Sequence, residues 1–321
     1  MSNCRRRDHP YCENCLRRFD VWERLLTLGV KFQLIPTLIT SRQPHYFFSL
    51  AHETSNNQEP KTNISMLLPF DAHNHIHLGP SPPTMALGWE PGGLPVAGMA
   101  VMSTHPRDFD PVCQLAVTLM ATEHQPVVVP CLGVHPWWLG ELTDEDWGPQ
   151  TDDCDIDRTT YNVSTNTPQW IARLERSLLA HPHAVVGEIG LDGVRFDPVT
   201  RELVCPLDRQ VQALTLQLQV AARLRRPVSL HAVQCFGALL DTLSSLVVEH
   251  VAAKKEMKLK QKENHSLQSP PPTTIPPALP PRIYFHAFGG KLGTVDQLLA
   301  VCRRGQCQAY FGFAPVVSKF Q

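Results

Sequence analysis

The sequence predicts an α/β fold, a TIM-type (β/α) barrel from which the eighth strand is missing, and two observations support this. Seven short apolar runs recur along the chain without alternation of polar and apolar residues, as expected of strands covered on both faces. They fall at residues 66–70, 96–102, 127–134, 184–189, 227–230, 282–285 and 308–313. Helical stretches separate several of these runs, and strands that alternate with helices are typical of a parallel sheet.

Three helices are predicted between the runs. Thr167 and Pro168 open the first, because threonine can cap a helix and proline is preset for its first turn. The second covers Leu207–Arg225, and the third has apolar residues at helical spacing from Val295 to Cys302.

Length and composition indicate an ordinary folded chain. Its 321 residues are 43% hydrophobic, which is enough for a substantial core, and the net charge of −1 provides no global field to attract nucleic acid. Its ten cysteines are scattered, no secretory leader precedes them, and no apolar run reaches the roughly 18 residues of a membrane span. We therefore expect reduced thiols in a cytoplasmic or nuclear protein that makes no membrane contact.

The chain divides into an N-terminal extension, residues 1–62, and the barrel, residues 63–321. We expect the extension to be poorly ordered or to hold one short helix over Phe19–Ile35. A group of candidate zinc ligands lies near its start, but their spacing matches no known zinc site. These residues are Cys4, His9, Cys12 and Cys15.

Two mobile insertions are predicted within the barrel. Residues 142–166 are acidic and polar, which indicates a solvated loop. Residues 253–281 begin with a lysine-rich run and end in a proline-rich stretch, and they hold too little apolar surface to fold. The proline-rich part is also a candidate docking site for a protein partner, and the lysines are candidates for contact with phosphates.

The first apolar run ends in an acid and alternating histidines. Along a strand, side chains two residues apart share a face, so His73 and His75 point to the same side, and His77 continues the pattern. Two imidazoles at the carboxyl end of a strand suit a divalent metal. The alternative is a histidine-rich turn at the surface.

Further polar residues follow the later strands. His135 follows the third run, Glu188 and Asp192 belong to the fourth, His231 follows the fifth and His286 the sixth. In a barrel these strand ends share one rim, where such folds build their sites. A glutamate in the apolar surroundings of Glu188 needs a charge partner, which a pair of metal ions would provide.

These motifs together resemble the TatD family of metal-dependent deoxyribonucleases, a branch of the amidohydrolase-type barrels. They occur in the family's order over residues 66 to 320. The motifs are Phe70-Asp71-Ala72-His73-Asn74-His75, Gly133-Val134-His135-Pro136, Gly187-Glu188-Ile189-Gly190-Leu191-Asp192, Arg226-Pro227-Val228-Ser229-Leu230-His231, Tyr284-Phe285-His286-Ala287-Phe288-Gly289-Gly290 and Tyr310-Phe311-Gly312-Phe313-Ala314-Pro315-Val316-Val317.

The resemblance implies a hydrolase that cleaves the phosphodiester bonds of DNA, or of RNA, with two divalent ions, Mg²⁺, Mn²⁺ or Zn²⁺. His73 and His75 would hold the first ion, and His231 and His286 the second. Glu188 would bridge the two ions and serve as the catalytic carboxylate. Two ions about 3.5–4 Å apart lower the pKa of a shared water and clamp the attacking and leaving oxygens.

The resemblance also suggests supporting residues and one departure from the family. Asp71 would orient the first histidines, and His135 would touch the substrate phosphate. Asp192 would either orient a ligand, as Asp71 does, or contact the substrate, as His135 does. The family pattern continues to an eighth strand whose aspartate binds the first metal, whereas this sequence stops at Gln321. We therefore expect the chain as given to be weakly active or inactive.

Two other functions fit the same sequence. One is a hydrolase of the same superfamily that acts on another ester or an amide, because a barrel specifies no substrate. The other is a catalytically weak interaction protein. Nucleophilic catalysis by Cys235, which follows the fifth strand, is less attractive because that residue fits ordinary helix packing.

Overall fold

The computed structural model describes residues 32–33, 49–50, 70–78, 98–120, 127–149, 167–263 and 275–313. These residues fall into two compact units, which are described separately. The first consists of Met1–Met102 with Asp110–Pro130, and the second of Ser103–Phe109 with Cys131–Gln321. The candidate zinc ligands between Cys4 and Cys15 lie outside the described residues.

The first unit contains the start of a parallel sheet. Strand β3 (Phe70–Asn74) pairs in parallel with β4 (Gly98–Met102). Gly98 is required where the strands pack closely, because a Cβ atom there would lie 2.6 Å from the carbonyl oxygen of Val127 and 2.7 Å from the ring of Phe70. After β4, helix α3 (Phe109–Met120) leads to β5 (Val127–Leu132).

A separate antiparallel pair, β1 (Phe32–Gln33) with β2 (Ser49–Leu50), belongs to the N-terminal extension. The helix predicted over Phe19–Ile35 lies outside the described residues except at β1. That short segment is a strand because its backbone pairs with β2.

The second unit contains further parallel strands. Its elements are 3-10 helices η2 (Pro106–Asp108) and η3 (Pro136–Glu141), α4 (Asp144–Trp147), α6 (Gln169–Ala180), β6 (Val185–Asp192), α7 (Leu207–Arg223), β7 (Val228–Val233), α8 (Phe236–Glu263), β8 (Arg282–Phe285), α9 (Leu292–Arg304) and β9 (Gln308–Phe311). All eight residues of β6 are buried. Parallel pairing joins β6 to β7, β7 to β8 and β8 to β9, as the aligned residues Ile189, Leu230 and Phe285 illustrate.

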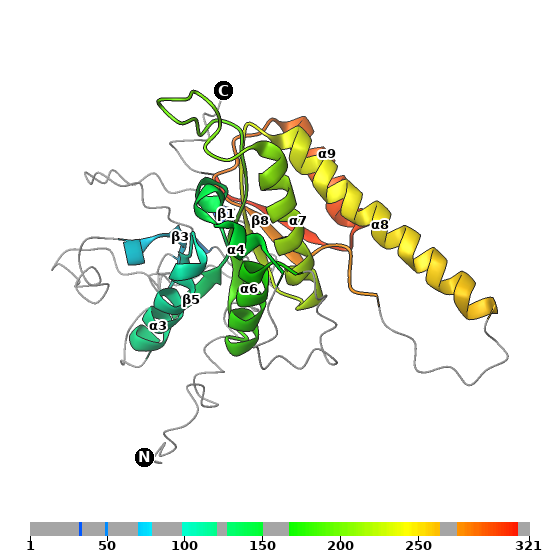
Figure 1. The fold of residues 1–321 in the computed structure, drawn as a ribbon, viewed down its shortest axis with the longest axis horizontal. Helices are drawn as coiled ribbons and strands as arrows, with labels where there is room; N and C mark the ends of the chain where they lie inside the picture. Colours follow the sequence, from blue (N-terminus) through cyan, green and yellow to red (C-terminus); the bar gives the residue numbers. More distant parts are fainter. Residues whose placement is uncertain are drawn as a thin grey trace, which may run out of the picture. The chain divides into compact units, whose positions relative to one another are not determined.

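The predicted fold class is confirmed. Neighbouring strands in the sheet are also neighbours along the chain, in the order β3-β4-β5-β6-β7-β8-β9, and helices separate most of them. Figure 1 labels several of these helices, among them α6, α7 and α8. Each of these strands overlaps one predicted apolar run, although β3 shares only Phe70 with its run, so the part of the chain that the structure describes contains seven of a barrel's eight strands.

Helix boundaries differ in one respect from the prediction. The helix expected after Thr167 and Pro168 is α6, which begins at Gln169. The prediction that Thr167 caps it is wrong, because Pro168 precedes the first helical residue and no side chain caps this end. The carbonyl oxygen of Pro168 instead accepts from the N–H groups of Ile171 and Ala172.

Helix α8 reaches further than expected. The insertion predicted to begin at residue 253 is helical up to Glu263, and Figure 1 shows this end of α8 extending past α9. Lysine and glutamate are good helix formers, and Lys260 pairs with Glu256 one turn earlier, so a helix that has already nucleated continues. The other insertion, residues 142–166, contains α4, and its remainder from residue 150 lies outside the described residues.

Helix α8 is also long and apolar enough to cross a membrane, by length and composition alone, over Phe236–Lys260. Core helices of soluble proteins meet the same criterion. In the first half of α8 one face is buried in the second unit, including Leu239, Leu243 and Leu246.

Candidate metal centre

The first unit holds two adjacent imidazoles at the end of β3. The rings of His73 and His75 lie edge to face, with their centroids 5.0 Å apart. Nδ1 of His75 lies 2.9 Å from the carbonyl oxygen of Met102, and because a carbonyl can only accept, Nδ1 carries the proton. Nε2 of His75 therefore presents a lone pair, as metal-binding histidines do when a carbonyl fixes the other nitrogen.

Asp71 orders the backbone around these imidazoles. Its carboxylate accepts from the backbone N–H of His73 at 3.1 Å and from the side-chain amide of Asn74 at 3.0 Å. These bonds fix the carboxyl end of β3, where His73 lies, so the carboxylate supports this histidine through its backbone.

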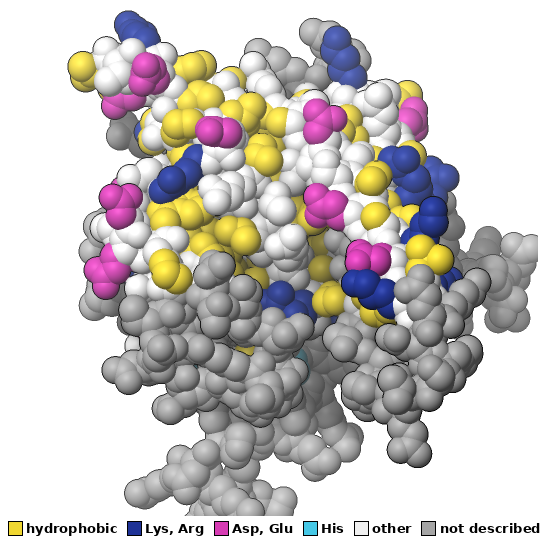
Figure 2. All heavy atoms as spheres, turned by 45° about the vertical axis from the view of Figure 1, so that its right-hand side comes forward, with side chains coloured by type: hydrophobic (Ala, Val, Ile, Leu, Met, Phe, Trp, Pro, Cys, Tyr) yellow, Lys and Arg dark blue, Asp and Glu magenta, His cyan; other side chains and the backbone are white. Residues whose placement is uncertain are grey.

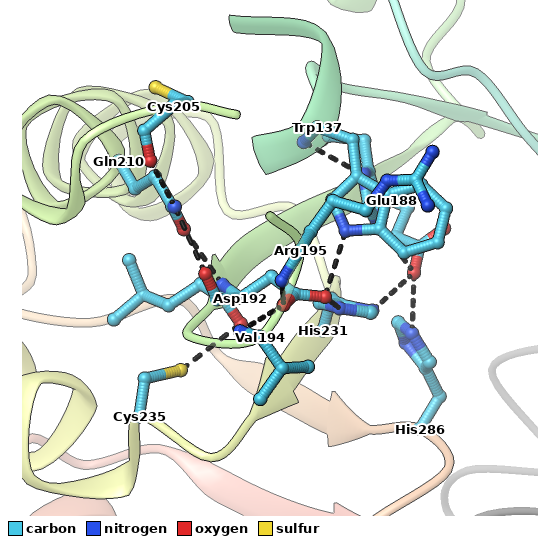
Figure 3. Close-up of polar contacts among 12 residues, drawn as sticks. Trp137, Glu188, Asp192, Val194, Arg195, Cys205, Gln210, His231, Cys235 and His286 are labelled. Atoms are coloured by element: carbon cyan, nitrogen blue, oxygen red, sulfur yellow. Dashed lines mark hydrogen bonds and ion pairs between the residues drawn. The ribbon is translucent and has the colours of Figure 1, made fainter. Parts of the chain in front are cut away.

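The second unit gathers imidazoles around one buried carboxylate, Glu188, whose side chain projects from β6 and is 3% exposed. Its Oε1 lies 2.7 Å from Nε2 of His286 and 3.0 Å from Nδ1 of His231 (Figure 3). The same oxygen lies 3.5 Å from Nε2 of His135. The close approach of β6 and β7 that allows this needs Gly187, where a Cβ atom would lie 2.9 Å from that of Ser229.

His231 lies between two carboxylates. Its Nδ1 faces Glu188, and its Nε2 lies 3.0 Å from Oδ2 of Asp192. Burial alone would lower the pKa of His231, but the hydrogen bonds and charges of Asp192 and Glu188 outweigh burial and raise it to about 9. A cation that binds this imidazole must therefore displace a proton.

Asp192 is fixed from several directions. Its Oδ1 accepts from the backbone N–H groups of Val194 and Arg195, and its Oδ2 accepts from Nε1 of Trp137 at 2.8 Å. Burial opposes ionisation of Asp192, but these bonds and the contact with His231 lower its pKa to about 2. A permanently ionised Asp192 can therefore hold the ring of His231 in one orientation.

His135 approaches the carboxylate from 3-10 helix η3, where it is the N-cap residue. Its Nδ1 accepts from the backbone N–H of Trp137 at 3.1 Å, so in the neutral ring the proton lies on Nε2. Nε2 is then a hydrogen-bond donor that points towards Glu188, and it offers no lone pair to a metal in this tautomer. Its predicted contact with a substrate phosphate stays a prediction.

His286 completes the cluster. Its Nδ1 lies 3.1 Å from Oγ of Ser229, and both side chains are buried. Ser229 is two residues before His231 on β7, so strand alternation places both on one face. The hydroxyl thus fixes the imidazole that faces Glu188.

These donors fit a divalent cation. Ligand atoms of His135, Glu188 and His231 all lie within 4.8 Å of one another, and His135 would join a metal through Nε2 only after that nitrogen loses its proton. His286 lies closer still to the same carboxylate oxygen than either of the other two imidazoles. Imidazole nitrogens around a buried carboxylate are the ligand set that zinc and similar ions accept.

The predicted site residues thus form two groups. The structure brings Glu188 together with His231, His286, His135 and Asp192. The residues on and after β3, Asp71, His73 and His75, lie in the other unit, and their convergence with Glu188 on a pair of ions stays a prediction.

Sequence reasoning missed three supporting residues. Ser229 could have been found from its alternation with His231, and Trp137 from its place next to the His135-Pro136 motif. Gln210, whose side-chain oxygen accepts from the N–H of Asp192 at 2.7 Å, gave no signal because it reaches the site from α7.

Cys235 plays no part in this arrangement. Its thiol donates to the carbonyl oxygen of Leu191 at 3.1 Å, and burial raises its pKa to about 11. A protonated, hydrogen-bonded thiol is a poor nucleophile.

Comparison with known proteins gives a consistent result. The model of the family described as "TatD related DNase" matches residues 70–320. The Cut9-interacting protein scn1 of Schizosaccharomyces pombe is 23% identical over 279 residues, which cover 77% of this chain and 76% of that protein.

Two solved structures are also similar. The TatD homologue YJJV of Escherichia coli is 21% identical, with a TM-score of 0.45, and the match covers 72% of this chain. An uncharacterised amidohydrolase of Saccharomyces cerevisiae is 16% identical, with a TM-score of 0.41 over 67% of this chain. The matches span 64% and 56% of those two chains.

Proposed function

Because the chain belongs to the TatD-related DNase family, we propose that it is a metal-dependent hydrolase that cleaves phosphodiester bonds in DNA. The observation that carries the proposal is the surroundings of Glu188. One oxygen of this buried carboxylate lies within 3.5 Å of nitrogens from three imidazoles. Such a carboxylate is stable when a cation compensates its charge.

Two divalent ions are part of the proposal. Glu188, His231 and His286 would hold one ion, and His73 and His75, with Glu188, would hold the other. Such ions, when bound, lower the pKa of water and stabilise the charge that develops on phosphoryl oxygens. We propose Mg²⁺, Mn²⁺ or Zn²⁺ in this role.

The residues of the chain itself supply position and hydrogen bonds. Asp192 and Ser229 orient the imidazoles of His231 and His286 through hydrogen bonds of 3.0 and 3.1 Å. The Nε2–H group of His135, which lies 3.5 Å from Oε1 of Glu188, would donate to a phosphate oxygen of the substrate. Burial of these groups keeps bulk water out, so each charge interaction is stronger than it would be in solution.

The surface offers no further guide to the substrate. Figure 2 shows basic and acidic side chains of the described residues interspersed on the face it presents, in keeping with a net charge of −1. We propose that nucleic acid is held locally, beside the metal centre.

Metal analysis combined with a cleavage assay tests the proposal. The purified chain, loaded with Mg²⁺, Mn²⁺ or Zn²⁺, should bind the ion stoichiometrically and cleave a labelled single-stranded oligonucleotide, even if slowly. A chelator should abolish cleavage, and the variant His286→Ala should lose at least about 100-fold in rate. Cleavage that persists in chelator, or in His286→Ala, would refute the proposal.

A protein-binding role is the second candidate. It is favoured by the fission yeast relative, which is named for its interaction with Cut9. In this case we propose a protein partner for the chain, in the cytoplasm or the nucleus. A chain that acts only as a scaffold needs no stoichiometric metal, so the metal analysis above separates the two functions.

A further inference from the structure

We propose that Arg195, held against the ring of Trp137, binds an anionic group of the substrate adjacent to the bond that is cleaved. In a nucleic acid this group is the neighbouring phosphate. The inference rests on the proposed hydrolase function and specifies which part of the substrate the chain recognises outside the metal centre.

Arg195 is attached to the metal centre through Asp192. Its backbone N–H donates to Oδ1 of Asp192 at 2.9 Å, while Oδ2 of the same carboxylate contacts His231. Its guanidinium carbon lies 4.8 Å from the ring centroid of Trp137, whose Nε1 also donates to Asp192. In Figure 3 the side chain of Arg195 lies across this ring. Both the backbone and the side chain of Arg195 are thus positioned by the carboxylate that orients His231.

The charge of Arg195 has no acidic partner, in contrast to two other arginines of the described residues. Arg223 pairs with Glu175 at 2.8 Å, and Arg107 pairs with Glu141 at 3.0 Å. Among the described residues no carboxylate lies within ion-pair distance of the guanidinium of Arg195, which is exposed. Stacking on Trp137 fixes the group but does not neutralise it. Its N–H edge is therefore available to an anion.

The geometry selects a phosphate. A guanidinium group presents parallel N–H donors that match two oxygens of a phosphate, and stacking on an aromatic ring reduces the entropy lost on binding. Large apolar side chains lie beside it at the surface: Trp137 is 38%, Val194 38% and Phe196 50% exposed. Exposed rings near a cation suit the sugars and bases between successive phosphates.

Short substrates with and without a second phosphate test the inference. The measured quantity is the ratio of kcat/KM for pTpT, or for TpTp, to that for TpT. The wild-type chain should prefer one phosphorylated form by about 10-fold or more, the usual contribution of a charge-assisted hydrogen-bonded pair. Arg195→Gln should reduce this ratio to about 1, and Arg195→Lys should retain part of it.

A matched control is available elsewhere in the second unit. The guanidinium carbon of Arg209 lies 4.0 Å from the ring centroid of Trp147 on α4, and Trp147 in turn contacts Trp170. Arg209→Gln removes a stacked arginine without touching Asp192, so it should leave the preference unchanged. The inference is overturned if wild type shows no preference for a phosphorylated form, or if Arg195→Gln retains it.

A binding measurement separates this inference from the proposed function. Fluorescence anisotropy with a labelled single-stranded oligonucleotide, in chelator, requires no cleavage. Arg195→Gln should raise the Kd by about 10-fold relative to wild type and to Arg209→Gln. If no metal supports cleavage but this loss of binding is found, the proposed function fails, whereas the binding of a nucleic-acid phosphate by Arg195 stands. An unchanged Kd overturns the inference even in an active enzyme.

Discussion

Two buried glutamates of the second unit have opposite surroundings. Glu175, on α6, is fully buried and is held by Arg223 of α7 through two contacts, of 3.2 Å and 2.8 Å. Glu188, on β6, is nearly as buried, at 3% exposure, but it faces three imidazoles. The same residue type, at similar burial, therefore has a permanent cation in one place and titratable nitrogens in the other.

The difference separates a carboxylate that is paired for stability from the one that we propose binds metal. The guanidinium of Arg223 is always charged, so the charge of Glu175 is compensated in every state of the protein. Imidazoles can give up their protons and offer lone pairs instead, so the histidines around Glu188 can exchange a proton for a metal ion. A buried acid surrounded by histidines thus indicates a binding site more strongly than burial alone does.

The largest expected effect follows from removing the charge of Glu188. Glu188→Gln should lower the cleavage rate by about 10³-fold or more, because the proposed ions lose their shared anionic ligand. The number of bound ions per chain, measured by mass spectrometry of the metals, should fall with it. Glu175→Gln is the matched control, since it makes the same change at a buried site and should retain its ions. Equal metal content in the two variants would remove the distinction between the two glutamates.

The second effect is on stability. Glu175→Gln should decrease the free energy of unfolding by about 3 kcal/mol, because it leaves Arg223 without its partner in a largely buried position. In chelator, Glu188→Gln should cost less, about 1 kcal/mol, because His231 keeps Asp192 as a partner. Urea denaturation in chelator measures both values. A larger loss for Glu188→Gln would contradict the stabilising role assigned to Glu175.

The third effect concerns the orientation of an imidazole next to Glu188. Asp192→Asn should weaken metal binding by about 10- to 100-fold, because the amide no longer holds His231 as an ionised acceptor. Isothermal titration with the metal that supports cleavage would measure the change.

Asp197→Asn is the control for this substitution. Asp197 lies in the same loop and accepts from the N–H groups of Val199 and Thr200 at 2.7 and 2.8 Å. Like Asp192, Asp197 accepts hydrogen bonds from backbone N–H groups, but these two partners include no imidazole. If both substitutions weaken metal binding equally, loop geometry rather than the contact with His231 is responsible.

Much of this comparison was predictable from sequence, because strand alternation is a local property. Glu188, His231 and His286 each belong to or directly follow a buried apolar run, and parallel strands in chain order bring their carboxyl ends to one edge. The burial of Glu188 was likewise expected from its apolar neighbours.

The remainder depends on contacts between distant segments. The ion pair between Glu175 and Arg223 joins two helices 48 residues apart, and no periodicity indicates it. The stacking of Arg195 on Trp137 links the loop after β6 with η3 in the same way. The sequence did not predict that α8 continues to Glu263, because composition was considered for the lysine-rich run alone. The helix continues into this run because its first half is already formed and packed.

The smallest effect is expected at Cys235. This residue lies near His231 in sequence and donates to the carbonyl oxygen of Leu191, but it is not part of the candidate metal centre. Its buried thiol has a pKa of about 11, so almost none of it is thiolate at neutral pH. Cys235→Ala should therefore change the metal-dependent cleavage rate by less than about twofold, and iodoacetamide at pH 8 should leave the folded wild-type chain active. A loss comparable to that of Glu188→Gln would instead favour nucleophilic catalysis, and the carboxylate would then be a support for the thiol rather than the centre of the site.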